Sequence, residues 1–224
     1  MNIWFIMIAV MVASYIIQAT LQSKFEKYSH VRNTAGMTGA EVAQKMLRDH
    51  GINNVKVTCI AGQLTDHFNP QTMTVNLSEA VYSTNSVAAA AVAAHECGHA
   101  VQHATGYAPI RLRSALVPVV SFASSWVQWV LLAGVVLVNS IPAVLWLGIA
   151  LFAMTTLFSF VTLPVEINAS SRAVDWLERS GIANYEVRPM AVDALKWAAY
   201  TYVVAALGSL ATLLYYIGIA NRRD

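Results

Sequence analysis

Long apolar segments alternate with polar ones along the chain, and this pattern predicts four membrane-spanning helices. Segment 1–23 carries no charge and is almost continuously apolar from Ile3 to Ile17, about the shortest length that crosses a bilayer as a helix. Segment 114–165 also lacks charge and is long enough for two crossings, with Pro142 near the expected reversal. Segment 198–221 supplies the fourth crossing. Buried core helices are the alternative, but they rarely extend beyond about 20 residues without a charge.

The first apolar segment is predicted to be a retained anchor rather than a cleaved signal peptide. No Lys or Arg precedes its apolar run, and no clear small-x-small cleavage site follows. The pattern therefore divides the chain into an anchor, a polar catalytic region, a transmembrane hairpin, a second polar segment and a terminal transmembrane helix: 1–23, 24–113, 114–165, 166–197 and 198–221.

The distribution of basic residues predicts the orientation of these segments. Four crossings put both polar regions on one side, and that side holds most of the Lys and Arg near the span ends, whereas Arg222 and Arg223 lie opposite. Short loops rich in Lys and Arg tend to stay in the cytoplasm. Cys59 and Cys97, if reduced, fit the same compartment. We therefore expect a multi-pass protein of the cell (plasma) membrane whose active site faces the cytoplasm.

The first polar region is expected to form a small α+β unit. Thr38 to Glu41 has capping-box spacing and opens an amphipathic helix that ends near Gly51. Segments 55–60 and 72–77 are rich in β-branched residues and predict a short antiparallel sheet. Residues 84–86 offer N-cap candidates for the next helix. The predicted fold class is thus a mainly α integral membrane protein with a small α+β, zincin-like catalytic region.

Composition narrows the classes of function. The chain has 224 residues, of which 57% are hydrophobic and 12% charged, about half the charge content usual in soluble domains. An ordinary soluble enzyme is excluded, as are a disordered chain and, with 2 Cys, a disulfide scaffold. The net charge of +2 comes without a basic run, so nucleic acid is not an expected partner. The lipid bilayer is an expected partner.

The sequence His95-Glu96-Cys97-Gly98-His99 has the spacing of a zinc-peptidase helix. Two histidines four residues apart lie on one helical face, about 6 Å from each other along the axis, so both imidazoles can reach one ion. Glu96 follows the first ligand and is placed to take a proton from water rather than to bind the metal. We expect Zn²⁺ as the cofactor, with His95 and His99 as ligands and Glu96 as the catalytic base.

A catalytic zinc usually takes a third protein ligand. The metzincin extension is excluded because Gln102 and Thr105 stand where Gly and His are needed. His103 lies about 12 Å from His95 along the axis, too far for the same ion. Glu166 is the best carboxylate candidate, because the predicted topology returns it to the same side after Pro164, where a new helix is expected. Weaker candidates for the third ligand are Glu79, Asp175 and Glu178. The alternative role for Glu166 is a helix-terminal charge at the membrane surface.

These residues belong to longer runs that resemble the neutral zinc metallopeptidases of bacterial membranes, the Zn_peptidase_2 family. The runs are Leu64-Thr-Asp-His-Phe-Asn-Pro70, Asn76-Leu-Ser-Glu-Ala-Val-Tyr82, Ser86-Val-Ala-Ala-Ala-Ala-Val-Ala-Ala-His-Glu-Cys-Gly-His-Ala-Val-Gln102 and Leu163-Pro-Val-Glu-Ile-Asn-Ala-Ser170. The resemblance covers nearly the whole chain and implies a membrane-embedded gluzincin that uses the histidines and Glu96 as above, with Glu166 as third ligand. The layout is more distantly similar to CAAX-prenyl-protease-type enzymes, whose Glu-x-x-x-Asp pattern has Ser170 in its last position here.

The expected reaction is hydrolysis of a peptide bond, in a peptide or a membrane protein, by zinc-activated water. Arg172 is a candidate oxyanion partner, with a headgroup or surface contact as its alternative. Segment 72–77 directly precedes the active helix and is expected to offer an edge to which an extended substrate adds.

Two other classes of function remain as alternatives. In the first, the chain is a non-catalytic membrane scaffold or transport component whose histidines are structural. In the second, it is an iron or di-metal oxidase, which is disfavoured because the spans lack the required His and carboxylate pairs.

Overall fold

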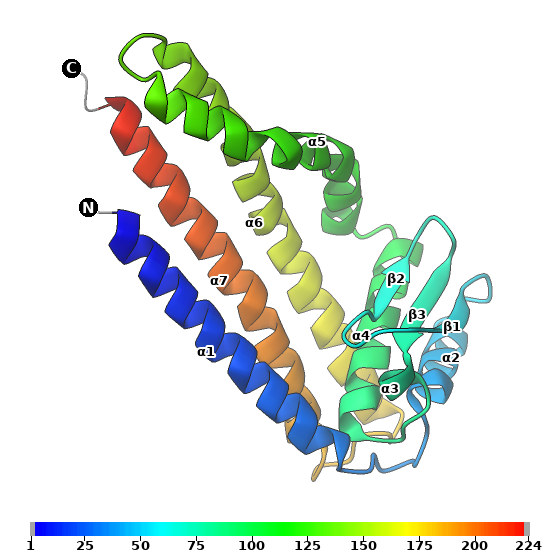
Figure 1. Ribbon diagram of the computed structural model, residues 1–224. Coiled ribbons are helices and arrows are strands. Elements are labelled where there is room, and N and C mark those ends of the chain that lie inside the picture. Colours follow the sequence, from blue (N-terminus) through cyan, green and yellow to red (C-terminus); the bar gives the residue numbers. More distant parts are fainter. Residues whose placement is uncertain (1–2, 222–224) are drawn as a thin grey trace. The chain divides into compact units, whose positions relative to one another are not determined.

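The computed structural model describes residues 3–221, so Arg222 and Arg223, which entered the orientation argument, lie outside the described residues. Figure 1 shows a mostly helical chain with one small sheet. Its elements are α1 (Ile3–Ser29), α2 (Gly39–Asp49), β1 (Lys56–Ile60), β2 (His67–Asn69), β3 (Thr74–Ser78), α3 (Glu79–Tyr82), α4 (Val87–Ala104), α5 (Ala108–Val136), α6 (Pro142–Arg179) and α7 (Arg188–Asn221).

Within residues 3–221, four helices are long and apolar enough to cross a membrane, which confirms the predicted number. They are α1, α5, α6 and α7, with 18-residue windows that reach mean hydropathies of 1.9, 1.7, 2.1 and 1.9. The expected break at Pro164 is wrong, because α6 continues through this proline for 38 residues. A proline removes one helical hydrogen bond, but a long apolar helix tolerates this when neighbouring groups compensate. One helix therefore carries both an apolar span and Glu166.

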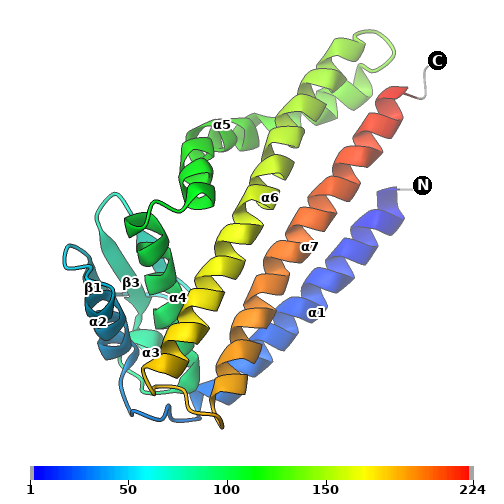
Figure 2. The same cartoon turned by 180° about the vertical axis from the view of Figure 1, so that it is seen from behind.

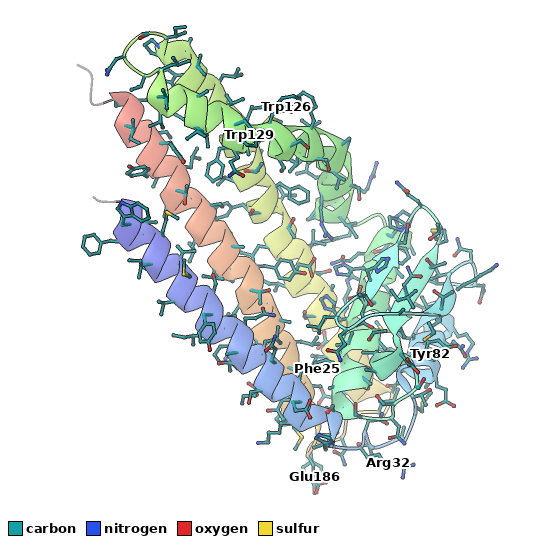
Figure 3. The ribbon with its side chains drawn as sticks, viewed as in Figure 1. Phe25, Arg32, Tyr82, Trp126, Trp129 and Glu186 are labelled. Atoms are coloured by element: carbon teal, nitrogen blue, oxygen red, sulfur yellow. The ribbon has the colours of Figure 1, made fainter. Side chains whose placement is uncertain are left out.

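The chain divides into two compact units. The first comprises Met1–Ile16, Arg111–Pro164 and Thr201–Asp224. Its described helices expose large apolar side chains, such as Trp126 and Trp129 of α5 (Figure 3). Inside this unit, a Cβ at Gly134 would lie 2.6 Å from the Cα of Leu145, so the backbones of α5 and α6 approach closely. Small residues at close helix contacts and apolar side chains on the outside are typical of membrane helices.

The second unit, Ile17–Ile110 and Val165–Tyr200, contains the small sheet. The sheet has the order β1-β3-β2, with β1 parallel and β2 antiparallel to β3. The predicted all-antiparallel sheet is therefore wrong. The chain reverses twice between β1 and β3, once before and once after β2, so that β1 and β3 run in the same direction. The sequence pattern missed β2 because it has only three residues.

The position of β3 also corrects the expectation about substrate. Segment 72–77 was expected to offer a free edge, but β3 is paired on both sides. Among the described strands, β1 and β2 form the edges of the sheet.

Helices α2 and α4 contribute much of the core of the second unit. The predicted capping box is present, since the Thr38 side chain accepts from the Glu41 N–H and the Glu41 carboxylate accepts from the Thr38 N–H. Ser86 is the N-cap of α4 and accepts a hydrogen bond from the Ala89 N–H at 3.1 Å. The alanine-rich start of α4 is buried together with Val42 and Met46 of α2. Seen from behind, α4 lies beside the part of α6 that belongs to this unit (Figure 2).

Candidate metal centre

His95 and His99 lie one turn apart on α4, as the spacing predicts. Their ring centroids are 4.8 Å apart and the rings are nearly perpendicular, with an interplanar angle of 85°. His99 is buried and His95 is partly buried. Both imidazoles therefore converge on one volume at the surface of α4 where little water has access.

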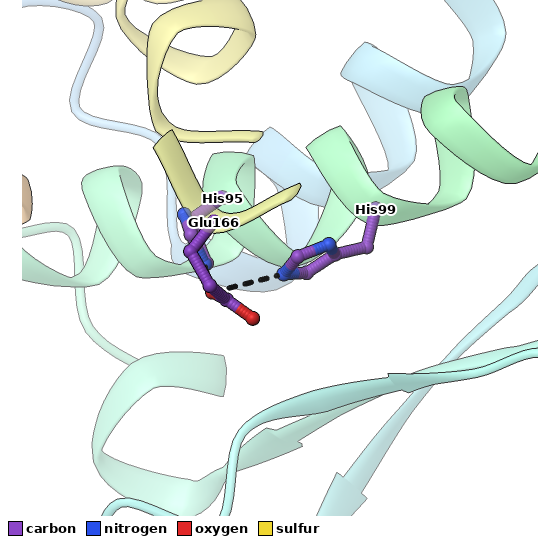
Figure 4. A group of neighbouring side chains, drawn as sticks. All are labelled: His95, His99 and Glu166. Atoms are coloured by element: carbon purple, nitrogen blue, oxygen red, sulfur yellow. Dashed lines mark hydrogen bonds and ion pairs between the residues drawn. The ribbon is translucent and has the colours of Figure 1, made fainter. Parts of the chain in front are cut away.

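Glu166 of α6 completes this cluster. Its Oε2 atom is 3.3 Å from His95 Nε2 and 3.5 Å from His99 Nε2 (Figure 4). Glu166 is only 2% exposed, although carboxylates are rarely buried without a charged or metal partner. The structure thus brings together the three residues that the sequence predicts as ligands. Among the described residues, they form the one group of three or more His, Cys, Asp or Glu that is arranged to hold a metal ion.

Two of the distances within this cluster match those between the ligand atoms of a zinc ion, and all of its ligand atoms lie within 4.8 Å of one another. Zinc binds imidazole nitrogen and carboxylate oxygen at about 2.0–2.2 Å in a tetrahedral arrangement, which separates neighbouring ligand atoms by about 3.3–3.5 Å. The two distances from Glu166 Oε2 to the imidazole Nε2 atoms, 3.3 and 3.5 Å, lie in this range. Two nitrogens and one oxygen are also a donor set that zinc accepts in catalytic sites, where a fourth position stays open for water.

The opposite nitrogen of each imidazole has a polar partner. His95 Nδ1 lies 3.0 Å from Ser170 Oγ, and His99 Nδ1 lies 3.1 Å from Gln102 Oε1. Such contacts leave the Nε2 atoms directed at Glu166, and metal-binding histidines usually donate their second N–H in this way. Neither Gln102 nor Ser170 was predicted from the sequence to contact the histidines. The available signal was their spacing: Gln102 lies three residues after His99 and Ser170 four residues after Glu166, each on the same helical face as the ligand.

Gly98 explains how α4 and α6 come close enough for this cluster to form. A Cβ at Gly98 would lie 2.7 Å from the carbonyl oxygen of Ala169 and 3.1 Å from its Cα. Both atoms belong to the backbone and cannot move aside as a flexible side chain would. A glycine between the two histidines therefore permits a helix contact that any larger residue would prevent.

Glu96 is held against the edge strand of the sheet. Its Oε2 atom accepts a hydrogen bond of 3.0 Å from the N–H of Phe68 in β2, and Glu96 is 9% exposed. The carboxylate is therefore fixed through one oxygen beside the histidine cluster.

The charges around the cluster act on the pKa of His99. Burial lowers this pKa, but the hydrogen bond to the Glu166 carboxylate and the negative charge of Glu96 raise it, and the net shift is upward. The surroundings of the imidazole therefore favour positive charge, as a cation site requires. In contrast, burial raises the pKa of the Cys97 thiol, which points to Ala43 and is not part of the cluster.

The other candidate residues have different partners. Glu178 pairs with Arg188 at 2.6 Å, and His103 is exposed with its ring 5.8 Å from that of Phe68. Arg172 donates to Asn168 Oδ1 at 2.8 Å and lies over the ring of Tyr107. Glu79 and Asp175, the remaining rival ligands, are not members of the metal-binding group found among the described residues.

Comparison with known proteins also points to zinc. Residues 3–221 match the Zn_peptidase_2 family, which is described as "Putative neutral zinc metallopeptidase". The chain belongs to this family. It is also 42% identical over 223 residues to the "Putative membrane protease YugP" of Bacillus subtilis (strain 168), covering 98% of this chain and 97% of the relative. No solved structure matches the chain. In this member of the Zn_peptidase_2 family, the zinc named by the family description has its candidate ligands in His95, His99 and Glu166.

Proposed function

We propose that the chain is a membrane-embedded zinc metalloendopeptidase of the gluzincin type, with His95, His99 and Glu166 as ligands. The observation that carries the proposal is the buried carboxylate of Glu166 beside both Nε2 atoms of the histidine pair. A His-Glu-x-x-His helix provides two ligands and a base, and a glutamate from a second helix provides the third ligand. The family description and the relative's name support the same reaction class.

In the proposed reaction, Glu96 is the general base. A zinc ion at this site would supply Lewis-acid chemistry, lowering the pKa of its water toward 7 and polarising the scissile carbonyl. Glu96 takes a proton from the attacking water as its oxygen bonds to the carbonyl carbon, and transfers this proton to the leaving amine nitrogen when the C–N bond breaks. The Phe68 N–H holds one carboxylate oxygen of Glu96, so we assign the proton transfer to the other oxygen.

We propose a zincin-like arrangement for substrate binding, in which an extended peptide runs beside β2. This strand is an edge of the sheet, and Phe68 within it contacts Glu96. Extended peptides add to exposed strand edges through backbone hydrogen bonds. The substrate class is therefore an extended segment of a peptide or membrane protein, and nucleic acid is not a proposed partner because the chain lacks a basic run.

We place the reaction at the cytoplasmic side of the cell membrane. The basic residues near the span ends favour this side for both polar regions. Glu166 follows directly after the charge-free segment 114–165, which supports a site at the lipid boundary rather than deep within the bilayer.

The alternative is a non-catalytic membrane scaffold or transport component, and Glu96→Gln separates the two. Detergent-purified wild type and Glu96→Gln would be compared for zinc content and for cleavage of a quenched-fluorescent peptide library. A peptidase predicts full zinc loading in both and a loss of cleavage of about 10²-fold or more in the variant, because a general base contributes at least this factor. Unchanged cleavage by Glu96→Gln would contradict the proposed mechanism, and a scaffold predicts no zinc-dependent cleavage by either protein.

A further inference from the structure

Gln102 is a fully buried amide that connects α4 with α6. It is 0% exposed, and its Nε2 donates hydrogen bonds of 2.8 Å to the carbonyl oxygen of Val165 and 3.0 Å to Asn168 Oδ1. Its Oε1 lies 3.1 Å from His99 Nδ1. A buried amide is costly unless its polar atoms have partners, and here the amide oxygen and nitrogen both have them.

These contacts determine which nitrogen of His99 carries a proton. A backbone carbonyl such as that of Val165 only accepts hydrogen bonds, so it requires the NH₂ group of Gln102 on its side. The amide oxygen then faces His99, and because this oxygen also only accepts, His99 Nδ1 has to be the donor. In the neutral imidazole, this contact favours the proton on Nδ1 and the lone pair on Nε2. It opposes the Glu166 carboxylate, which lies on the Nε2 side and also only accepts, so loss of the Gln102 contact would leave the Nε2–H form favoured.

His95 provides a contrast within the same cluster. Its Nδ1 contacts the hydroxyl of Ser170, which is able to donate or accept. The Ser170 contact alone does not select a tautomer of His95. The tautomer of His99, in contrast, is determined by a chain of contacts that begins at the backbone of α6.

The same amide also acts on the third ligand. Val165 immediately precedes Glu166, so the hydrogen bond from Gln102 ties α4 to α6 one residue from the carboxylate. Asn168 Oδ1 accepts from both Gln102 Nε2 and Arg172 Nε, which keeps the acceptor oxygen of Asn168 directed at Gln102.

We propose that Gln102 is a positioning residue of the metal centre: it holds His99 in the tautomer whose Nε2 binds the ion, and it keeps Glu166 in register with the histidines. This inference rests on the proposed zinc peptidase function for its purpose. Contacts of this kind with a metal-binding histidine typically change metal affinity by about 10- to 100-fold.

The test compares Gln102→Leu and Gln102→Glu with a control. Leucine has a similar volume but no polar atoms, whereas glutamate keeps an acceptor for His99 Nδ1–H and loses the donor to Val165. Asn33→Leu is the matched control, because Asn33 is 3% exposed and its amide also donates to backbone carbonyls, those of Met37 and Asn85. It removes an equally buried amide that does not contact the histidines.

Two measurements are made on each full-length protein in detergent. Competition with a chromogenic chelator gives the zinc affinity, and two-bond ¹⁵N–¹H NMR of ¹⁵N-histidine-labelled, metal-free protein at alkaline pH gives the tautomer of His99. We expect Gln102→Leu to weaken zinc binding by about 10- to 100-fold and to lose the dominant Nδ1–H form. Gln102→Glu is expected to keep the Nδ1–H form, and Asn33→Leu to lower thermal stability while zinc affinity stays within about 3-fold of wild type.

The inference is overturned if Gln102→Leu keeps the wild-type tautomer and affinity, or if Asn33→Leu loses as much affinity. Should Gln102→Leu fail to fold, loss of the Nδ1–H form in Gln102→Glu would overturn the inference as well. Absence of zinc binding by the unaltered protein would contradict the proposed function, while the tautomer comparison, made without metal, would still decide the role of Gln102.

Discussion

Gly98 of α4 and Ala169 of α6 approach so closely that a Cβ at Gly98 would lie 2.7 Å from the Ala169 carbonyl oxygen. Gly98 stands between His95 and His99, and Ala169 stands three residues after Glu166. The helix contact therefore occurs beside the ligand cluster, and its closeness sets how far the carboxylate lies from the imidazoles.

Enlarging Gly98 should separate the two helices and weaken the metal site. Gly98→Ala places a methyl group against backbone atoms that cannot yield, which we expect to cost about 1–3 kcal/mol of folding stability and to lower zinc affinity. Gly218→Ala in α7 is the control, because a Cβ there meets no atom within 4 Å. Thermal unfolding and zinc titration of both variants provide the check. Wild-type affinity in Gly98→Ala would show that this contact does not set the ligand geometry.

Ser170 should support His95 through its hydroxyl. The 3.0 Å contact with His95 Nδ1 links α6 to the histidine pair, so Ser170→Ala should weaken zinc binding by about 10-fold. Ser170→Asp offers a charged acceptor to the same nitrogen and should bind zinc at least as tightly as wild type. Ser125→Ala, which removes a hydroxyl bonded to the Ser121 carbonyl in α5, should have no effect. Equal affinities in all three variants would refute the role of Ser170.

The two cysteines should differ sharply in reactivity. Cys59 is exposed, whereas Cys97 is buried and burial raises the pKa of its thiol, so little reactive thiolate forms. We expect a maleimide to modify one thiol per folded chain and two per unfolded chain, as read by intact mass. Cys59→Ser should abolish labelling of the folded protein. Rapid modification of Cys97 in the folded state would show that the surroundings of this α4 residue are accessible to solvent, contrary to its buried position.

Zinc binding should weaken as the pH falls. The weakening should begin at a higher pH than it would for a site whose histidine has an ordinary pKa. The pKa of His99 is raised above its usual 6.5, so protons compete with zinc for the imidazole already at pH values above 6.5. In the metal-free protein, the stability that His99 gains from its acidic neighbours is fully present below pH 6.5 and is lost as the pH rises through the folded pKa.

The increase in unfolding temperature on adding zinc should therefore shrink as the pH is lowered from 8 to 6. His30→Gln is the control, because His30 is an exposed residue that pairs with Glu26 outside the cluster. A zinc-induced increase that is the same at both pH values would contradict the assignment of His99 as a ligand.

Local sequence signals predicted the parts of the fold that depend on neighbouring residues. The capping box at Thr38 and Glu41 and the N-cap at Ser86 are formed within three residues of each helix start. The four long apolar helices were predicted from charge-free stretches that are longer than those of buried helices in soluble proteins. Glu166 was found because topology limits which carboxylates return to the side of the histidines.

Features that depend on distant partners were not predictable in the same way. Gln102 acts through Val165 and Asn168, which are 63 and 66 residues away, and no local pattern marks that pairing. The mixed sheet depends on the three residues of β2, which are too few for a period to be recognised. A proline was expected to end a helix, but α6 continues through Pro164. Whether a helix tolerates a proline depends on its tertiary surroundings, which the local sequence does not reveal.

The most direct test is the zinc stoichiometry of purified ligand variants, measured by mass spectrometry of the metal after dialysis against a weak chelator. We predict one zinc per chain for the wild type and for Glu79→Ala, and loss of bound zinc in His95→Ala, His99→Ala and Glu166→Ala, each checked for folding by circular dichroism. Wild-type zinc content in a folded Glu166→Ala variant would contradict the claim that residues of α4 and α6 together coordinate one ion.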